Sequence, residues 1–514
     1  MLIKIILLIV FFSIMIAVGV STRKAATDVN GFVLGGRKVG PWLTAFAYGT
    51  SYFSAVVFVG YAGQFGYKYG LSATWIGIGN ALIGSLLAWV ILGRRTRVMS
   101  KHLESATMPD FLGKRYHSQA IRIVAAIISF VFLIPYTASV YNGLSRLFGM
   151  AFNVDYTVCV IVMALLTAVY VILGGYMATA INDFIQGIIM LVGIVAVVVA
   201  VLNGNGGFFE AYIKLSEMES ECAVTEGLRG AYVSFFGPDP VNLLGVIVLT
   251  SLGTWGLPQM VQKFYAIKDE QSIKTGTIIS TFFAVVVAGG CYFLGGFGRL
   301  AVTDPAAISN EKGIIYDAII PLMLSKLPDI LIGVVVVLVL SASMSTLSSL
   351  VLTSSSTLTL DLIKGNIVKK FSEKKQLFTM RVLIVVFIVI SVVIAINPPT
   401  FIAQLMGISW GALAGAFLAP LLYGLYWKGV TRGGVWAGFV AGVGITVVNM
   451  FTNWMSPINA GAVCMVAGLV VVPLVSLVTP KLDKGEIDFS FKCYDKKKVV
   501  EEKIALPDDV IADK

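Results

Sequence analysis

The sequence predicts an all-α integral membrane protein with thirteen transmembrane helices, and three observations lead to that fold class. Only 13% of the 514 residues are charged and 57% are hydrophobic, whereas soluble domains average about 25% charged residues. This shortage of charge extends along the whole chain. Apolar runs of about 20 residues, the length that a helix needs to cross a bilayer, recur from one end to the other.

The thirteen predicted spans follow one another with mostly short connections. They lie at residues 2–20, 42–64, 71–93, 121–148, 155–174, 184–203, 241–262, 275–298, 329–358, 378–397, 401–427, 432–452 and 461–479. Residues 1–479 are therefore predicted to form one transmembrane domain. The first run has one early lysine and no clear cleavage site before its basic flank, so we interpret it as an uncleaved span, with a signal peptide as the alternative.

The distribution of Lys and Arg predicts the orientation of the chain. Thirteen spans place the two termini on opposite sides, and the loops on one side carry 20 Lys and Arg residues against 6 on the other. Loops rich in these residues stay in the cytoplasm. The sequence thus predicts a multi-pass protein of the plasma membrane with its N-terminus outside and residues 480–514 as a cytoplasmic tail. The same loops explain the net charge of +10, so it does not indicate nucleic-acid binding.

The centre of the second span is unusually polar. Residues 47–55 combine Gly49 with the hydroxyl residues Thr50, Ser51 and Ser54. A glycine followed by hydroxyl residues favours an unwinding point. The alternative is a continuous helix that packs through small residues, with its hydroxyls bonded back to carbonyls, and this segment alone leaves both open.

The seventh span contains a stronger signal for a break, Gly253-Thr-Trp-Gly-Leu-Pro258. Two glycines and a proline within six residues favour a kink or interruption. The second and seventh spans open two blocks of five spans each, and the two blocks have opposite orientation. This is the arrangement of a transporter with a 5+5 inverted-repeat core, here residues 42–427, whose site lies at the paired breaks.

The ninth span carries a stripe of small and hydroxyl residues. At 100° per residue, Ala342, Ser345, Thr346 and Ser349 share one helical face, and Ser348 adjoins it. Hydroxyl and carbonyl oxygens suit a hard, weakly held cation such as sodium. The alternative is a small-residue packing face, which is the more common use of such a stripe in membrane helices.

Asp183 lies just inside the sixth span. An ionisable group at membrane depth is costly and indicates a functional role by default. The alternative is a helix-end cap exposed to the cytoplasm, where a carboxylate favours a helix N-terminus. The sequence leaves the two interpretations level.

The order of these motifs resembles the sodium:solute symporter family, most closely its sodium/proline branch. The similar elements are Leu34-Gly-Gly-Arg-Lys-Val-Gly-Pro41, Gly174-Gly-Tyr-Met-Ala178 with Asp183 and Gln186, Gly256-Leu-Pro258 and Met344-Ser-Thr-Leu-Ser348, within a resemblance that runs from Leu34 to Trp427. The resemblance implies a LeuT-type fold with a ten-helix core and one preceding helix. It also implies import of a small organic solute with sodium by alternating access, the solute being an amino acid such as proline.

The resemblance implies positions for the transported ions and solute as well. A first sodium would bind the backbone carbonyls of Thr50, Phe53 and Ala342 and the hydroxyls of Ser345 and Thr346. Some members hold a second sodium, and its positions map to Asp183, Ser345, Ser348 and Ser349. The solute would lie between the two broken spans, near Ser54, Gln64, Tyr136, Thr254 and Trp255.

One residue departs from the proline branch, which usually has Asp where this chain has Tyr52. The departure weakens the expectation of proline and keeps open a monocarboxylate, a sugar or a sialic acid. Proton coupling, with Asp183 as the proton carrier, is a further alternative. The expected partners are thus a small solute, sodium ions and the lipid bilayer, while the oligomeric state is left open.

Two other classes of protein fit the sequence less well. A membrane-embedded enzyme would need a cluster of His, Asp or Glu at one membrane face, and the chain shows none, so no catalytic residue is expected. A solute sensor would need an attached signalling domain, for which the tail at 480–514 is too short.

Overall fold

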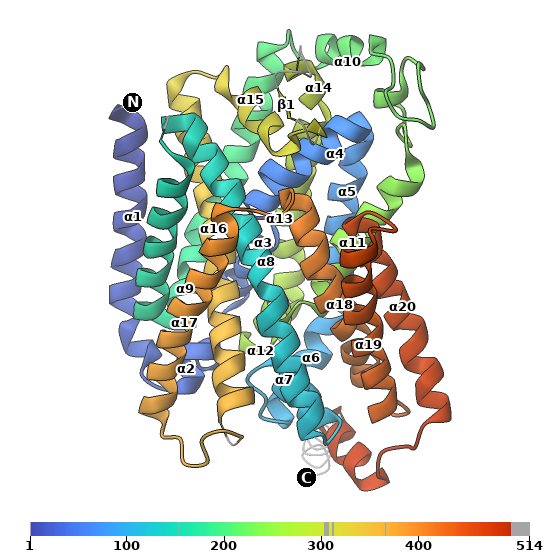
Figure 1. The fold of residues 1–514 in the computed structure, drawn as a ribbon. Coiled ribbons are helices and arrows are strands. Elements are labelled where there is room, and N and C mark those ends of the chain that lie inside the picture. The colour runs from blue at the N-terminus through green and yellow to red at the C-terminus, as the bar shows by residue number, and fades with distance from the viewer. Residues whose placement is uncertain (1, 153, 303–307, 311–312, 365, 495–514) are drawn as a thin grey trace, which may run out of the picture.

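The structure, a computed structural model, describes residues 2–152, 154–302, 308–310, 313–364 and 366–494. It is a bundle of long helices whose two ends carry short helices and loops (Figure 1). The predicted tail at 480–514 is described as far as residue 494. The rest of the tail lies outside the described residues.

Long or broken helices run through the bundle, and short ones lie at its ends. The former are α1 (Leu2–Thr22), α3 (Pro41–Tyr52), η3 (Val56–Tyr61), α4 (Ala62–Tyr69), α5 (Thr74–Gly79), η5 (Asn80–Leu87), η6 (Trp89–Gly93), α8 (Gln119–Phe152), α9 (Tyr156–Gly204), α11 (Pro240–Gly256), α12 (Pro258–Ala266), α13 (Glu270–Gly296), α16 (Asp329–Thr357), η10 (Leu358–Ile363), α17 (Glu373–Ile396), α18 (Ile402–Tyr426), α19 (Arg432–Thr452) and α20 (Pro457–Val478). The latter are η1 (Arg23–Ala26), α2 (Val29–Leu34), η2 (Gly35–Arg37), η4 (Gly70–Ala73), α6 (Arg94–His102), α7 (Met108–Arg115), α10 (Phe208–Glu217), η7 (Ala231–Val233), α14 (Gly298–Ala301), η9 (Tyr316–Ala318) and α15 (Ile319–Ser325), with an antiparallel pair of strands, β1 (Ser309–Asn310) and β2 (Gly313–Ile314).

The helices confirm a multi-pass membrane protein, but not the predicted number of spans. By length and composition, ten helices among the described residues can cross a bilayer, or eleven if α11 and α12 form one bent span. The difference from thirteen lies in the broken helices. Val56–His102 counts as one helix although Gly70 interrupts it at φ +62°, and Gly175 at φ +56° divides α9. The first half of α9 is then too short to count.

Both predicted interruptions are present in the structure. After α3 the chain leaves helical geometry at Phe53, with φ −107° and ψ 89°, and η3 resumes at Val56. Between α11 and α12 the extended residue Leu257 produces a bend of 46°. Pro258 begins α12 at a position where proline costs no helical hydrogen bond. Two broken helices therefore enter the interior of the bundle.

The crossing of α4 and α13 depends on two glycines. A Cβ atom on Gly66 would lie 2.0 Å from the carbonyl carbon and oxygen of Gly295. A Cβ atom on Gly295 would lie 2.1 Å from the carbonyl oxygen of Ala62. The two backbones touch here, so the crossing can form only without side chains on these residues.

The end of the bundle that carries α6 and α7, at the bottom of Figure 1, is held by ion pairs. Arg122, at the start of α8, lies 2.9 Å from a carboxylate oxygen of Asp361 in η10 and 3.2 Å from one of Asp110 in α7. Asp361 is fully buried and Arg122 is 21% exposed. One guanidinium thus joins three helices.

Arg122→Ala is expected to lower the melting temperature of the purified protein, because it leaves the buried Asp361 carboxylate without its cation. Breaking a buried pair in this way costs about 3–5 kcal/mol. Arg229→Ala is the matched control, since its pair with Glu219 is 70% and 62% exposed and such surface pairs contribute about 0–1 kcal/mol. Equal melting temperatures for the two variants would contradict the assigned role of Arg122.

Candidate functional site

The break after α3 lies against the hydroxyl face of α16. Ser345 Oγ donates a hydrogen bond to the carbonyl oxygen of Thr50 (2.9 Å), and Thr346 Oγ1 lies 3.3 Å from the same oxygen. Both hydroxyls also contact the carbonyl oxygen of Ala342, each at 3.1 Å. Four of the five residues predicted for a first sodium therefore form one buried oxygen cluster.

The fifth residue, Phe53, lies at the break itself. Its backbone N–H donates to the carbonyl of Gly49 (3.1 Å) and closes the last turn of α3. Among the described residues no hydrogen bond joins Phe53 to the oxygen cluster. Phe53 therefore lies outside regular helical geometry, and its carbonyl stays a predicted ligand.

The cluster can hold a hard monovalent cation. All of its oxygens belong to carbonyls and hydroxyls, which carry no formal charge, and its four residues are at most 1% exposed. Each hydroxyl can rotate its proton away and offer a lone pair to an ion. A neutral set of oxygens favours a weakly held cation over a tightly bound divalent metal.

Asp183 lies inside α9 and is completely buried. The interpretation as an exposed helix-end cap is therefore wrong, because α9 continues on both sides of this residue and Gly175 divides it eight residues earlier. One carboxylate oxygen of Asp183 lies 3.7 Å from Nζ of Lys263, which comes from α12. Lys263 Nζ in turn donates to Ser349 Oγ (2.9 Å).

Two of the four residues mapped to a second sodium thus lie at a lysine. Asp183 and Ser349 both face the ammonium of Lys263, while Ser348 Oγ bonds back to the carbonyl of Ser345 on its own helix (2.9 Å). The predicted spans at 241–262 and 275–298 left Lys263 in the charged loop between them. The structure instead buries it in α12, with its side chain 3% exposed.

The residues predicted to contact the solute lie on different helices and have different partners. Thr254 Oγ1 donates to the carbonyl of Gly84 (3.1 Å) and Trp255 Nε1 to that of Ile83 (3.0 Å), so both connect α11 to η5. Ser54 Oγ accepts from the N–H of Val56 (3.2 Å) at the start of η3. Tyr136 packs edge-on against Trp410 of α18, with ring centroids 5.9 Å apart.

Tyr52 stands at the centre of an aromatic cluster beside the break. Its ring stacks on Phe53 (4.2 Å) and faces Trp410 (6.1 Å). Its hydroxyl donates to the carbonyl of Thr250 in α11 (2.6 Å). Gly84 leaves room for this hydroxyl, since a Cβ atom there would lie 2.2 Å from it. Tyr52 therefore bridges the two broken helices.

Several buried polar atoms around Tyr52 have no hydrogen-bond partner among the described residues. They are Tyr61 Oη, Asn80 Nδ2, Tyr136 Oη, Tyr292 Oη and Trp410 Nε1, although Tyr136 and Trp410 face each other, as do Tyr292 and Asn80. Buried polar groups are normally satisfied, so a group of unpartnered donors favours a ligand. Only Tyr136 was predicted. The others were missed because single Tyr, Asn and Trp residues within apolar runs form no motif.

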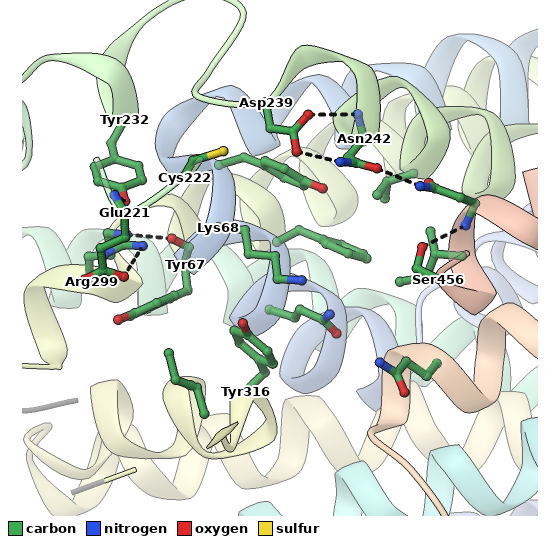
Figure 2. A pocket seen from close by; sticks show the side chains of 18 of the residues that line it. Tyr67, Lys68, Glu221, Cys222, Tyr232, Asp239, Asn242, Arg299, Tyr316 and Ser456 are labelled. Atoms are coloured by element: carbon green, nitrogen blue, oxygen red, sulfur yellow. Dashed lines mark hydrogen bonds and ion pairs between the residues drawn. The ribbon is translucent and has the colours of Figure 1, made fainter. Parts of the chain in front are cut away.

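Gln64 lines a cavity of about 490 Å³ near the end of the bundle that carries α10 and α14. None of the other four residues predicted for the solute lines this cavity. Figure 2 shows its walls, where Arg299 pairs with Glu221 (3.1 Å) and lies over the ring of Tyr67 (4.0 Å). Lys68 lies over Tyr316 in the same cavity (5.0 Å). Gln64 therefore faces this cavity, apart from the other four predicted residues.

Comparisons with known proteins find similarity to sodium-coupled symporters along nearly the whole chain. The model of the sodium:solute symporter family matches residues 32–442. A sodium/proline symporter of Staphylococcus aureus (strain JH9) is 32% identical over 495 residues, which cover 93% of this chain and 92% of that protein, and the one of strain NCTC 8325 gives the same values.

Two solved structures share the fold. One is the substrate-bound, outward-open state of a Na⁺-coupled sialic acid symporter, with a TM-score of 0.76, 16% identity and coverage of 94% of this chain and 99% of the other. The second is a nucleobase-cation-symport-1 family transporter in a closed conformation with bromovinylhydantoin bound, with a TM-score of 0.53, 13% identity and coverage of 89% and 97%.

Proposed function

The chain belongs to the sodium:solute symporter family and imports a small solute together with sodium, and we propose that this solute is an amino acid such as proline. The observation that carries the proposal is the identity of 32% over 93% of the chain with sodium/proline symporters. The predicted LeuT-type fold is confirmed by the solved structures that share it.

We propose that the first sodium binds where α3 breaks against α16. The carbonyls of Thr50, Phe53 and Ala342 and the hydroxyls of Ser345 and Thr346 are its ligands. The convergence of Ser345 and Thr346 on the Thr50 carbonyl supports this assignment. Sodium would join the two helices more firmly than the present hydrogen bonds do, and its higher affinity for the joined state couples ion binding to the conformational change.

The proposed solute site lies beside the break, between the two broken helices. Ser54, Tyr136, Thr254 and Trp255 belong to it, while Gln64 lies on the path through the cavity of Figure 2. The unpartnered donors around Tyr52 support a solute rich in hydrogen-bond acceptors. When the solute leaves this site, its contacts with the donors around Tyr52 are lost, and the loss favours the return of the transporter to the state that binds solute.

One observation favours a second candidate, a monocarboxylate. An amino acid carries an ammonium that needs an acceptor, and in the proline branch an Asp is usual where Tyr52 stands. The groups around Tyr52 are phenols, an amide and an indole, which suit a carboxylate better than an ammonium. A sugar or a sialic acid is the further alternative, because neither carries an ammonium.

The proposed orientation places the cavity and α10 outside the cell, and α6 and α7 in the cytoplasm. The 20 Lys and Arg residues in the loops of one side against 6 on the other support it. The N-terminus is then outside and the tail inside the plasma membrane. The whole of residues 1–479 acts as one transporter domain, with its core at 42–427.

The proposal is tested by measuring the melting temperature of the purified protein with a panel of solutes, once in sodium and once in potassium. We expect proline to raise the melting temperature in sodium and not in potassium. Stabilisation by a monocarboxylate, a sugar or a sialic acid but not by proline would contradict the proposed solute. A solute effect indifferent to sodium but dependent on pH would contradict the sodium site and favour proton coupling.

A further inference from the structure

A buried lysine lies beside residues that map to the second sodium of some members of the family. Lys263 comes from α12, directly after the break at Leu257, and its side chain is 3% exposed. Its ammonium lies 3.7 Å from the Asp183 carboxylate and 2.9 Å from Ser349 Oγ. It also lies 5.2 Å from the centre of the Tyr176 ring.

The charges at this place are balanced without a bound ion. Asp183 is fully buried, and neither of its oxygens has a hydrogen-bond donor among the described residues. A buried carboxylate needs a compensating cation. Within the described part of the chain, Lys263 is the cationic group paired with it. The ammonium therefore supplies the charge that a second sodium would otherwise bring.

The lysine is also connected to the proposed first sodium site. Ser349 Oγ, which accepts from Lys263, lies 2.9 Å from Ser51 Oγ in α3. The carbonyl of Ser51 lies 3.4 Å from Thr346 Oγ1, one of the proposed sodium ligands. A short chain of polar groups thus runs from the ammonium to the ion site and joins α12, α16 and α3.

We propose that the ammonium of Lys263 is a built-in second cation, so that this protein carries a single sodium ion for each solute. A tethered cation balances the charge of Asp183 throughout the transport cycle. Because it is not carried across the membrane, it draws no energy from the sodium gradient for solute uptake. The inference rests on the proposed first sodium site. It predicts that removing the ammonium frees Asp183, Ser345, Ser348 and Ser349 to bind a second sodium.

The experiment is equilibrium binding of ²²Na⁺ to the purified full-length protein. We expect about one sodium per protein for the wild type and about two for Lys263→Ala, with the binding curve becoming steeper because both ions share one network. Lys263→Arg should keep about one, because it preserves the cation. The double variant Asp183→Asn/Lys263→Ala should also return to about one, because it removes the carboxylate that attracts the second ion.

Lys428→Ala is the matched control. It also removes one lysine from an ion pair, but the Lys428 side chain is 58% exposed and its partner is Asp488, not Asp183. Two sodium ions on the wild type would overturn this inference while leaving the first site intact. One ion on Lys263→Ala would also overturn it and make the Asp183–Lys263 pair purely structural. No ion on the wild type would overturn the sodium site of the proposed function, and this inference with it. If Lys263→Ala does not fold, the wild-type count still tests the inference, because two bound sodium ions would overturn it.

Discussion

Ser345→Ala is expected to weaken sodium binding by roughly 10- to 100-fold, because it removes one oxygen ligand of the proposed first site. Loss of a buried polar contact of this kind costs about 1–3 kcal/mol, and each 1.4 kcal/mol is about a tenfold change in affinity. The measurement is the sodium concentration at half-maximal thermal stabilisation, with potassium replacing sodium to hold ionic strength constant.

Ser343→Ala is the matched control for this prediction. Ser343 lies two residues away on the same buried helix, but its hydroxyl bonds back to the carbonyl of Val339 (2.7 Å) within α16. Both variants remove one buried hydroxyl, so they differ only in what that hydroxyl faces. An unchanged sodium midpoint for Ser345→Ala, or an equal shift for both variants, would show that the oxygen cluster is a packing contact.

Gly66→Ala is expected to prevent the protein from reaching its folded state. Its Cβ atom would lie 2.0 Å from the Gly295 carbonyl, an atom of the backbone that cannot rotate aside. Overpacking in a well-packed core costs about 1–3 kcal/mol, and separation of two helices in contact should exceed that range. The measurement is the monodisperse fraction of a fluorescent fusion in detergent, compared at equal total expression.

Gly289→Ala provides the control, since it makes the same change in α13 where a Cβ atom meets nothing within 4 Å. We expect it to behave as the wild type. A monodisperse Gly66→Ala protein would show that α4 and α13 can move apart at this crossing.

Features that depend on a few neighbouring residues were predictable. The apolar runs, the polar centre of the second span and the Gly-Pro segment around Leu257 were all visible in the sequence. Their physical causes, burial in lipid and the loss of a helical hydrogen bond, act over one helix or less. The hydroxyl face of α16 belongs to the same class, because the helical period alone places Ser345 beside Ala342.

Features that depend on distant segments were not predictable in this way. Lys263 was counted with loop charges because a lysine near the end of a span can equally reach the cytoplasm, and only the fold buries it beside Asp183, 80 positions earlier. The number of spans was likewise not confirmed, because breaks such as that at Gly175 depend on packing. Gln64 was expected at the break but lines the cavity of Figure 2.

By itself, the sequence determined that this chain is a membrane-spanning helical transporter with two interrupted helices, because hydrophobicity and helix-breaking residues act locally. Only the tertiary structure decided which polar groups meet inside it. Thr50 and Ser345 are 295 positions apart and share a hydrogen bond, and Tyr52 reaches the carbonyl of Thr250 across 198 positions. Pairing across such separations depends on how the helices pack, and it is this packing that places an ammonium beside the only carboxylate that α9 buries among its described residues.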